Sequence, residues 1–499
     1  MPTPSVQQFI LLPPRGLTAD AVVPSTDGVR SFLTTLNTVF KASTPRTAMG
    51  ATRIRTQVRV IDSIHENGAK LVELSPNDVS ALRAEQPGLR VVPVVYFQTA
   101  EAPRPSIAPG AKGSFSAQAV KLRLQIVSRA GGAPVPSATV VAFTDFANRL
   151  GAQGTTNSQG IVSLALGGES KKVQRLYVYA DGGFWNLLRK NVTLKTGGQI
   201  SLRPLDLSFT DSLRHFYGTS PLDAGRGVKV GVIDTGVEPH PDLKIDGGAN
   251  TVTGENPNDF DDNGDGHGTH VAGIIAARGT PPSGVRGLAP AVSLRSYRVF
   301  GQNSHNASNF SIAKAIDRAV SDGCDLINMS LGGGAPDEAT HSAMANARAS
   351  GTVVFAANGN DGRQPVSSPA ADSLALAVSA LGRKGTYPSG VAQADEAIKP
   401  FGKDKKNFIA AFSNIGPETD LTGPGVGVIS TFPGGHAVLD GTSMACPAVV
   451  GAAARMLGGR PDLLGLKRDQ ARSDAIVAAV LQGAKQLGFG GIFEGQGLL

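Results

Sequence analysis

The sequence has almost no cysteine. Two cysteines, Cys324 and Cys446, occur among 499 residues. That number is too small for a disulfide framework or for a cysteine-rich zinc cluster. Both lie in apolar stretches, so we expect them to be free, buried thiols.

Long apolar runs and dense blocks of charge of one sign are also missing. No apolar run approaches the length of a membrane span, so we expect none. The net charge is +7, but acidic and basic residues are mixed, and no basic stretch is longer than KDKK at Lys403–Lys406. We therefore expect a basic, solvated surface and no nucleic-acid partner.

The N-terminal stretch MPTPSVQQFILLPPRG lacks the basic region and the long apolar core of a secretory signal. A cytoplasmic location is therefore the default expectation. Secretion is the alternative, because a mature form would have lost its signal.

What is present indicates a globular protein of several domains. Hydrophobic residues make up 41% and charged residues 17% of the chain, which suits packed cores rather than disorder. A chain of 499 residues is too long for one ordinary domain. Three zones separate by pattern, and we place them at residues 1–98, 118–204 and 205–499, with a linker at 99–117.

The first zone predicts a small α+β unit with its core at about residues 50–98. TQVRVIDSI and LRVVPVVYF are typical of strands. Between them, SPNDVSALRAEQPG predicts a helix with Ser75 as its cap, Pro76 at its first position and Pro87-Gly88 as its stop. The Pro-, Ala- and Gly-rich residues 99–117 then indicate an exposed linker.

The second zone, 118–204, consists of short alternating runs such as VKLRLQIV, ATVVAFT, GIVSLAL and RLYVYA, separated by glycine- and asparagine-rich turns. This pattern predicts a small antiparallel β-sandwich. Its turn spacing is similar to that of transthyretin-like or carboxypeptidase-regulatory-like domains. Catalytic residue types do not cluster in it, so we expect a structural or docking role.

The third zone, 205–499, alternates apolar strands with helices. VKVGVIDTGV, VSLRSYRVF, CDLINMSLG and TVVFAANGN predict strands, whereas GTHVAGIIAARG and NFSIAKAIDRAVSDG predict helices. This alternation predicts an α/β fold with a mainly parallel sheet. Asp234, Ser330 and Asn360 follow three of the strands, at the edge of the sheet where sites gather.

A lone serine, Ser443, stands in DGTSMACPAVV, just ahead of a run of small apolar residues. ACPAVVGAAARML predicts a buried helix, with Pro447 in its first turn, where a missing N–H costs nothing. Ser443 then lies near the helix N-terminus, where N–H groups and the helix dipole favour negative charge. This stretch alone leaves two interpretations open, a helix cap and a nucleophile.

Other residues supply the groups that a serine nucleophile needs. The hydroxyl needs a base, the base needs an orienting carboxylate, and the oxyanion that forms needs hydrogen-bond donors. Asp234 ends a predicted strand, and His267 begins a predicted helix. His270 is a nearby alternative base.

Seven stretches resemble blocks of the subtilisin-like serine proteases and occur in that family's order. They are GVIDTGVEPHPDL, GHGTHVAG, GVRGLAPAVSLRSYRVF, INMSLGG, VVFAANGNDG, AFSNIGPETDLTGPGV and DGTSMACP. The resemblance covers about residues 227–499. It implies a parallel α/β sheet with helices on both faces, and a serine endopeptidase that acts on proteins and requires no cofactor.

The same resemblance implies a role for each candidate residue. Ser443 would be the nucleophile, His267 the general base and acid, and Asp234 the carboxylate that holds the imidazole tautomer. Asn360 matches the family's oxyanion asparagine, whose amide would donate to the oxyanion beside the Ser443 N–H. His270 would be a packing residue.

Substrate binding follows from the same resemblance. Ser330, Leu331, Gly332 and Gly333 resemble the strand that pairs with an extended peptide, where glycines let a second backbone approach. The segment 300–310 falls where the family's opposite binding strand lies. Such a channel suits an extended polypeptide better than a small ester.

One acidic turn suggests calcium. DDNGDG places Asp261, Asn263 and Asp265 at alternate positions, which is similar to the start of a calcium loop. Position 12 of that loop is Ala272 rather than glutamate, so an EF-hand is excluded. The alternative is an acidic turn that leads into the helix of His267.

The first zone resembles the inhibitory prodomain of the family. We expect a zymogen whose residues 95–101 fill the active-site cleft, with self-cleavage in that segment. The alternative function is a protease-fold protein held inactive by its prodomain, acting as a partner-regulated or binding module. A lipase or esterase would carry G-x-S-x-G, which GTSMA does not match.

Overall fold

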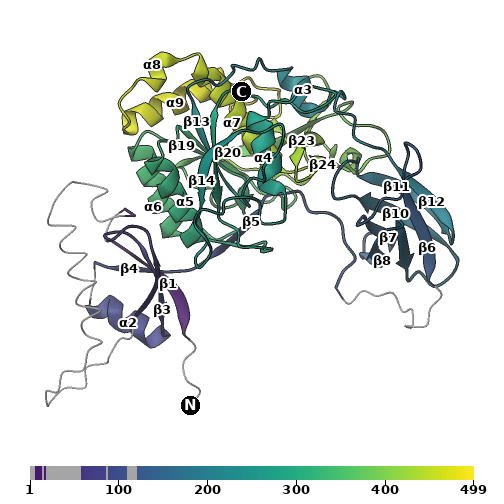
Figure 1. The fold of residues 1–499 in the computed structure, drawn as a ribbon, viewed down its shortest axis with the longest axis horizontal. Helices are drawn as coiled ribbons and strands as arrows, with labels where there is room; N and C mark the ends of the chain where they lie inside the picture. The colour runs from purple at the N-terminus through teal and green to yellow at the C-terminus, as the bar shows by residue number, and fades with distance from the viewer. Residues whose placement is uncertain (1–5, 14–15, 18–57, 86–87, 110–120) are drawn as a thin grey trace.

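The computed structural model describes residues 6–13, 16–17, 58–85, 88–109 and 121–499. Figure 1 shows an N-terminal unit, a β-sandwich and a large α/β unit, with the sandwich and the N-terminal unit lying on different sides of the α/β unit. In the part of the chain so described, no helix combines the length and the apolar character that crossing a membrane demands.

The N-terminal unit is a four-stranded sheet with one helix. Its strands are β1 (Gln7–Leu12), β2 (Arg59–Ser63), β3 (Lys70–Leu74) and β4 (Arg90–Pro93), in the order β2-β3-β1-β4. β1 pairs antiparallel with both β3 and β4. The core expected at residues 50–98 therefore omitted the central strand β1. This strand has the sequence QQFILL, and its Ile10 and Leu11 are fully buried.

The helix of this unit, α2 (Pro76–Glu85), begins where the sequence predicted. The Asp78 N–H donates to Ser75 Oγ at 3.2 Å, and the Ser75 N–H and hydroxyl donate to the Asp78 carboxylate. These reciprocal bonds satisfy helix N–H groups that would otherwise lack acceptors. Pro87, the first residue of the expected stop, lies outside the described residues.

The expected single strand LRVVPVVYF is in fact two strands in different sheets. β4 ends at Pro93, and β5 (Tyr96–Thr99) leaves the N-terminal unit to lie between β16 (Ala307–Ser308) and β18 (Leu331–Gly332). Between them Val95 is held by Asn309, whose Oδ1 accepts from the Val95 N–H at 3.2 Å. Proline cannot donate to a ladder, so it suits the end of β4.

The β-sandwich occupies the expected zone and has two sheets. The first has the order β11-β10-β7-β8 and the second β12-β6-β9. Their strands are β6 (Leu122–Ser128), β7 (Thr139–Asp145), β8 (Leu150–Thr155), β9 (Ile161–Leu164), β10 (Ser170–Tyr179), β11 (Leu187–Lys195) and β12 (Gly198–Leu202). One pair, β12 with β6, is parallel, whereas we expected only antiparallel pairs.

The α/β unit is built on one large sheet in the order β14-β15-β13-β17-β19-β20-β21, with β22 pairing β20. The strands are β13 (Lys229–Asp234), β14 (Ile245–Asn250), β15 (Ser293–Arg298), β17 (Leu326–Met329), β19 (Val353–Ala357), β20 (Ala375–Arg383), β21 (Asn407–Ile409) and β22 (Thr419–Pro424). Among these pairs only β20 with β21 is antiparallel. This is the predicted α/β fold.

Helices cover both faces of this sheet. α4 (His267–Ala276) and α7 (Thr442–Gly458) pack in one apolar core, while α5 (Asn309–Ser321) and α6 (Glu338–Ala349) pack in another. Successive strand residues alternate between the cores: Val353 and Phe355 face the first, Val354 and Ala356 the second. The period-two alternation of strand side chains explains this division.

The remaining elements surround the sheet. They are the helices α3 (Ser212–Tyr217), α8 (Pro461–Leu464), α9 (Gln470–Gly483) and α10 (Gly491–Glu494), a 3-10 helix (Ala392–Glu396), and the hairpin of β23 (Val428–Phe432) and β24 (Gly435–Leu439).

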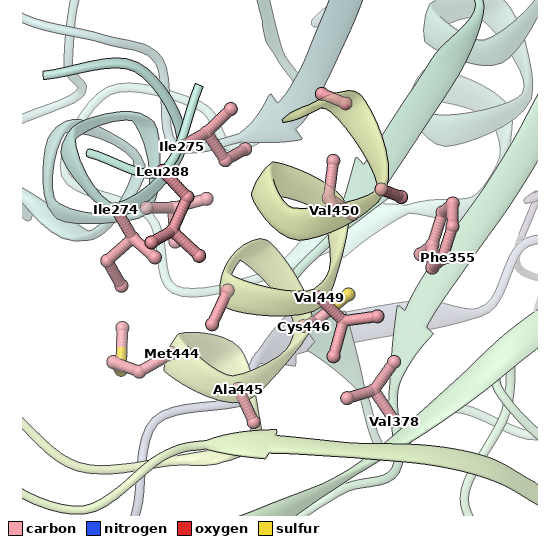
Figure 2. Packing of buried hydrophobic residues seen from close by; sticks show 14 of the residues in the cluster. Ile274, Ile275, Leu288, Phe355, Val378, Met444, Ala445, Cys446, Val449 and Val450 are labelled. Atoms are coloured by element: carbon pink, nitrogen blue, oxygen red, sulfur yellow. The ribbon is translucent and has the colours of Figure 1, made fainter. Parts of the chain in front are cut away.

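α7 is the buried helix that the small apolar residues predicted. Figure 2 shows it between the α4 side chains Ile274 and Ile275 and the sheet residues Phe355 and Val378. Pro447 was expected in the first turn but lies in the second. Its missing N–H leaves the Ser443 carbonyl without its usual helical donor, and Ser330 Oγ donates to that carbonyl at 2.9 Å instead.

Candidate active site

An aspartate and a histidine form a buried pair beside the end of the sheet. Asp234 is the last residue of β13, and His267 is the first residue of α4, after Gly266 with φ 86°. His267 Nδ1 and Asp234 Oδ1 lie 2.7 Å apart. Asp234 Oδ1 also accepts from the Thr235 N–H at 2.7 Å, which fixes the carboxylate.

The pKa of His267 is set by two opposing effects. Burial disfavours the imidazolium, but the charge of Asp234 and its hydrogen bond favour it more strongly, so the pKa of His267 is raised above its ordinary value. His267 Nε2 is buried and has no hydrogen-bond partner among the described residues. At a pH above this pKa the imidazole is neutral, and Nε2 can then accept a proton while Nδ1 is oriented by Asp234.

Ser443 lies in the first turn of α7, whose N-cap Gly441 supplies no side-chain cap. Its side chain is fully buried, and its hydroxyl donates to the Ser330 carbonyl at 3.0 Å. Its own N–H donates to the Ala100 carbonyl at 3.0 Å. The hydroxyl is therefore held beside β18 in this structure and not by His267.

Asn360 supplies a second donor to the same carbonyl. Asn360 Nδ2 donates to the Ala100 oxygen at 2.5 Å. Its Oδ1 accepts from the N–H and the hydroxyl of Thr442 at 2.9 and 3.0 Å, which orients the amide. Two donors from separate elements thus converge on one carbonyl oxygen, which is the arrangement of an oxyanion hole.

The cleft is filled by the chain's own strand β5. On one side Thr99 pairs with Leu331 and Gln98 with Gly332, and the Ala100 N–H donates to the Ser330 carbonyl at 3.0 Å. Of the four residues expected to bind substrate, Gly333 follows β18 and lies outside its pairing with β5, although its φ of 91° is one that favours glycine.

On the opposite side β5 pairs with a short strand from the segment expected there. Phe97 pairs with Ala307 and Tyr96 with Ser308, both antiparallel. Phe97 is fully buried, and a Cβ at Gly334 would lie 2.5 Å from its ring. Glycine at 334 therefore leaves the space that this aromatic side chain fills.

Residues expected to lie in an exposed linker continue through the site. Ala100 is 6% exposed, and the Ala102 N–H donates to the Asp440 carbonyl at 2.8 Å. The Ala100–Glu101 peptide bond therefore lies directly over Ser443 and Asn360. The rest of the expected linker is described only as far as residue 109.

His270 and Asn358, the asparagine two residues before Asn360, are both buried and hydrogen-bonded inside the protein. His270 Nε2 lies 3.1 Å from the Val428 carbonyl and 3.3 Å from the Ala437 carbonyl. Burial, and then the charge of His267, lower the pKa of His270 to about 3, so it stays neutral. Asn358 is buried and donates to Thr419 Oγ1 at 2.9 Å.

The acidic turn of the predicted calcium loop is largely engaged by the protein. Asn263 is fully buried and donates through Nδ2 to the carbonyls of Gly301 and Ser304. Asp265 Oδ2 lies 3.3 Å from His305 Nδ1. Over the described ranges, no three histidine, cysteine, aspartate or glutamate side chains come together as metal ligands do. Calcium at Asp261, Asn263 and Asp265 stays a prediction.

Some participants were missed from the sequence. Thr442 orients Asn360 through two hydrogen bonds, and Ser330 Oγ holds the Ser443 carbonyl. Thr442 stands beside Ser443 in DGTSMACP, but only the fold shows that it faces Asn360. The Ala100 carbonyl thus meets two donors beside a serine, and His267 of the buried histidine–aspartate pair lines the same cleft as Glu101. These are the groups that acyl transfer requires.

Comparison with known proteins gives consistent matches. The subtilase family model matches residues 225–498. Subtilisin BL of Lederbergia lenta is 42% identical over 231 residues, which is 46% of this chain and 76% of that protein. Subtilisin DY of Bacillus licheniformis is 42% identical over 242 residues, or 48% of this chain and 80% of that protein. An alkaline protease of Shouchella clausii is 42% identical over 231 residues, which cover 54% of its length.

The histidine environments predict separate titrations. In the Ser443→Ala protein, ¹⁵N NMR should show His267 gaining its proton at a pH above 6.5, because Asp234 raises its pKa. As the pH falls through that pKa, the neutral base is lost. Asp234→Asn should lower this pKa, whereas His270 should remain neutral from pH 5 to pH 9 in both proteins. An unchanged His267 titration in Asp234→Asn would contradict the pairing.

Proposed function

This chain belongs to the subtilase family of serine proteases, and we propose that it is a self-processing endopeptidase whose first substrate is its own Ala100–Glu101 bond. The observation that carries the proposal is the position of the Ala100 carbonyl, which accepts from both the Ser443 N–H and Asn360 Nδ2. A peptide bond between two donors and beside a serine is placed as a scissile bond would be.

The proposed chemistry begins when the Ser443 hydroxyl exchanges its contact with the Ser330 carbonyl for one with His267. Serine Oγ then attacks the Ala100 carbonyl carbon, and His267 Nε2 takes the hydroxyl proton. The Ser443 N–H and Asn360 Nδ2 bind the resulting oxyanion, while Asp234 stabilises the imidazolium.

Breakdown of this intermediate completes the cut. The C–N bond of Ala100–Glu101 breaks, and His267 gives its proton to the Glu101 nitrogen. Water, deprotonated by the same imidazole, then hydrolyses the Ala100 ester and releases Ser443. The same steps apply to any extended polypeptide that replaces β5 between β16 and β18.

We propose further that the N-terminal unit is the inhibitor of the enzyme. It binds α5 through an ion pair of Lys314 with Asp62 at 2.8 Å and a hydrogen bond between His65 Nε2 and Asp317 Oδ2 at 2.6 Å. Ile10 and Leu12 belong to the same apolar core as α5 and α6. These contacts, added to the pairing of β5, position the strand in the cleft.

Self-cleavage gives the first test of this function. The intact mass of the wild type should show one fragment ending at Ala100 and another beginning at Glu101, and a fluorophosphonate should label the second. Ser443→Ala should stay whole and unlabelled, while the exposed-site control Ser163→Ala should be cut like the wild type. An uncut, unlabelled wild type would favour the alternative, a chain held inactive as a partner-regulated or binding module.

The oxyanion site gives a second test. Asn360→Ala should lower kcat on a peptide substrate by about 10²–10³-fold with a small change in KM, because the donor acts on the oxyanion rather than on the bound substrate. The exposed control Asn148→Ala should keep the wild-type kcat. If Asn360→Ala changed KM alone, its role would be substrate binding and not oxyanion stabilisation.

Calcium at the Asp261–Asp265 turn is a separate proposal, because the proposed chemistry itself uses no metal. If calcium binds there, EDTA should lower the melting temperature of Ser443→Ala protein, and Asp265→Asn should abolish that dependence. A melting temperature that EDTA leaves unchanged rejects this site.

A further inference from the structure

We propose that the β-sandwich forms a binding site for the polypeptide that follows the scissile bond, and that this site selects a cationic side chain at the fourth residue after the cut. The inference rests on the proposed function in one respect, because the cut at Ala100–Glu101 makes Arg104 that fourth residue. In the uncut chain the site is occupied by the protein's own residues 101–108.

These residues are held by both the α/β unit and the sandwich. The Ala102 N–H donates to the Asp440 carbonyl at 2.8 Å, beside α7. The Ile107 N–H donates to Gln153 Oε1 at 2.9 Å, and the Ala108 N–H donates to the Arg149 carbonyl at 3.2 Å. The segment therefore leaves the active site and runs onto the sandwich as a bound peptide.

The groove that receives it has an aromatic wall and an acidic wall. A cavity of about 230 Å³ is lined by Tyr177 and Tyr179 from β10, and by Asp395, Glu396 and Asp440 from the α/β unit. The two tyrosine rings are stacked with centroids 5.9 Å apart. Burial raises the pKa of Glu396 to about 8, so at pH 7 the negative charge of this wall comes from the aspartates. A flat aromatic face beside an aspartate carboxylate is a favourable surface for a guanidinium or ammonium group.

Arg104 shows how the site takes such a group. Its guanidinium carbon lies 5.3 Å from the centroid of the Tyr179 ring. The nearby Asp440 carboxylate is fixed by the Gly427 N–H and Gln393 Nε2, both at 2.7 Å. Burial raises the pKa of Asp440 to about 6, so at pH 7 and above it is ionised and attracts Arg104.

Two other charged groups at the groove do not remove the preference for a cationic side chain at the position of Arg104. Arg175 also lines the cavity, but it pairs with Asp395 at 2.5 Å. Arg104 Nη2 donates to Glu101 Oε1 at 3.1 Å, and this bond belongs to the bound segment itself. A glutamate in place of Arg104 would lose the Tyr179 contact and would face Asp440.

The sandwich is fixed against the α/β unit, so Tyr179 has a defined place beside the cleft. Trp185 is buried in an apolar cluster with Ile429 and Val438 of the β23–β24 hairpin. The Leu188 N–H donates to the Gly390 carbonyl at 2.9 Å, and the Gly183 N–H donates to the His436 carbonyl at 2.8 Å. A wall held at this many points can contribute to substrate selection.

The test uses processed enzyme and four quenched fluorescent peptides with the sequence of residues 95–108. The residue at the position of Arg104 is arginine, lysine, alanine or glutamate. We expect kcat/KM for arginine and lysine to exceed that for glutamate by about five- to tenfold, as expected for a cation over an aromatic ring. The enzyme's own segment competes equally with all four peptides, so their ratio reports the site.

Variants of the sandwich then locate the selection. Tyr179→Leu should reduce the arginine-to-glutamate ratio to about twofold, since the ring supplies most of the contact, whereas Tyr179→Phe should largely keep it. Arg123→Ala, an exposed change on the other sheet of the sandwich, is the matched control and should keep the ratio. Fluorophosphonate titration corrects each rate for the amount of folded site.

Three outcomes would overturn the inference. Equal cleavage of all four peptides would show that the enzyme does not select the fourth residue after the cut. If Tyr179→Leu does not fold, the four peptides on the wild-type enzyme decide the question alone. An unchanged arginine-to-glutamate ratio of kcat/KM in folded Tyr179→Leu would show that the sandwich does not select this residue. Failure to cut any peptide at its Ala–Glu bond, with an uncut precursor, would instead overturn the proposed function and this inference with it.

Discussion

The N-terminus of α7 is buried and has no side-chain cap. Its first N–H groups therefore take their acceptors from other parts of the structure. An unpaired buried N–H costs about 1–3 kcal/mol. The Thr442 N–H finds Asn360 Oδ1, and the Ser443 N–H finds the Ala100 carbonyl. The helix therefore needs an oxygen from outside itself, and the group that supplies it is the carbonyl of a peptide lying in the cleft.

The same helix connects the nucleophile to the strand that binds the peptide. Because Pro447 lacks an N–H, the Ser443 carbonyl is open to the Ser330 hydroxyl. The Ser330 carbonyl in turn accepts from the Ala100 N–H and from Ser443 Oγ. Ser330, the residue just before β18, thus fixes both the register of the bound strand and the position of the Ser443 hydroxyl. Neither can shift without the other.

Local patterns were enough to predict the α/β fold, and the resemblance to the subtilisin-like proteases then selected Ser443 and Asn360, which meet at the Ala100 carbonyl. Asp234 and Asn360 follow strands, and parallel strands bring their carboxyl ends to one edge of a sheet. Local patterns were not enough for β1, the separation of β4 from β5, or the path of residues 100–108. Those features depend on pairing between distant segments, such as Tyr96 with Ser308, which no local periodicity encodes. Tyr179 was missed for the same reason, since it faces the cleft only because of how the sandwich docks.

The hold of the N-terminal unit on the α/β unit has a consequence for when the enzyme becomes active. Hydrolysis of one peptide bond removes none of the pairing of β5, the ion pair of Asp62, the hydrogen bond of His65, or the burial of Ile10 and Leu12. The proposed cut at Ala100–Glu101 would convert a tethered segment into a separate ligand that still occupies the cleft. Activity would from then on depend on dissociation, and the fraction of open sites would rise on dilution. Two solutions with equally complete cleavage but different concentrations would therefore differ in activity per molecule.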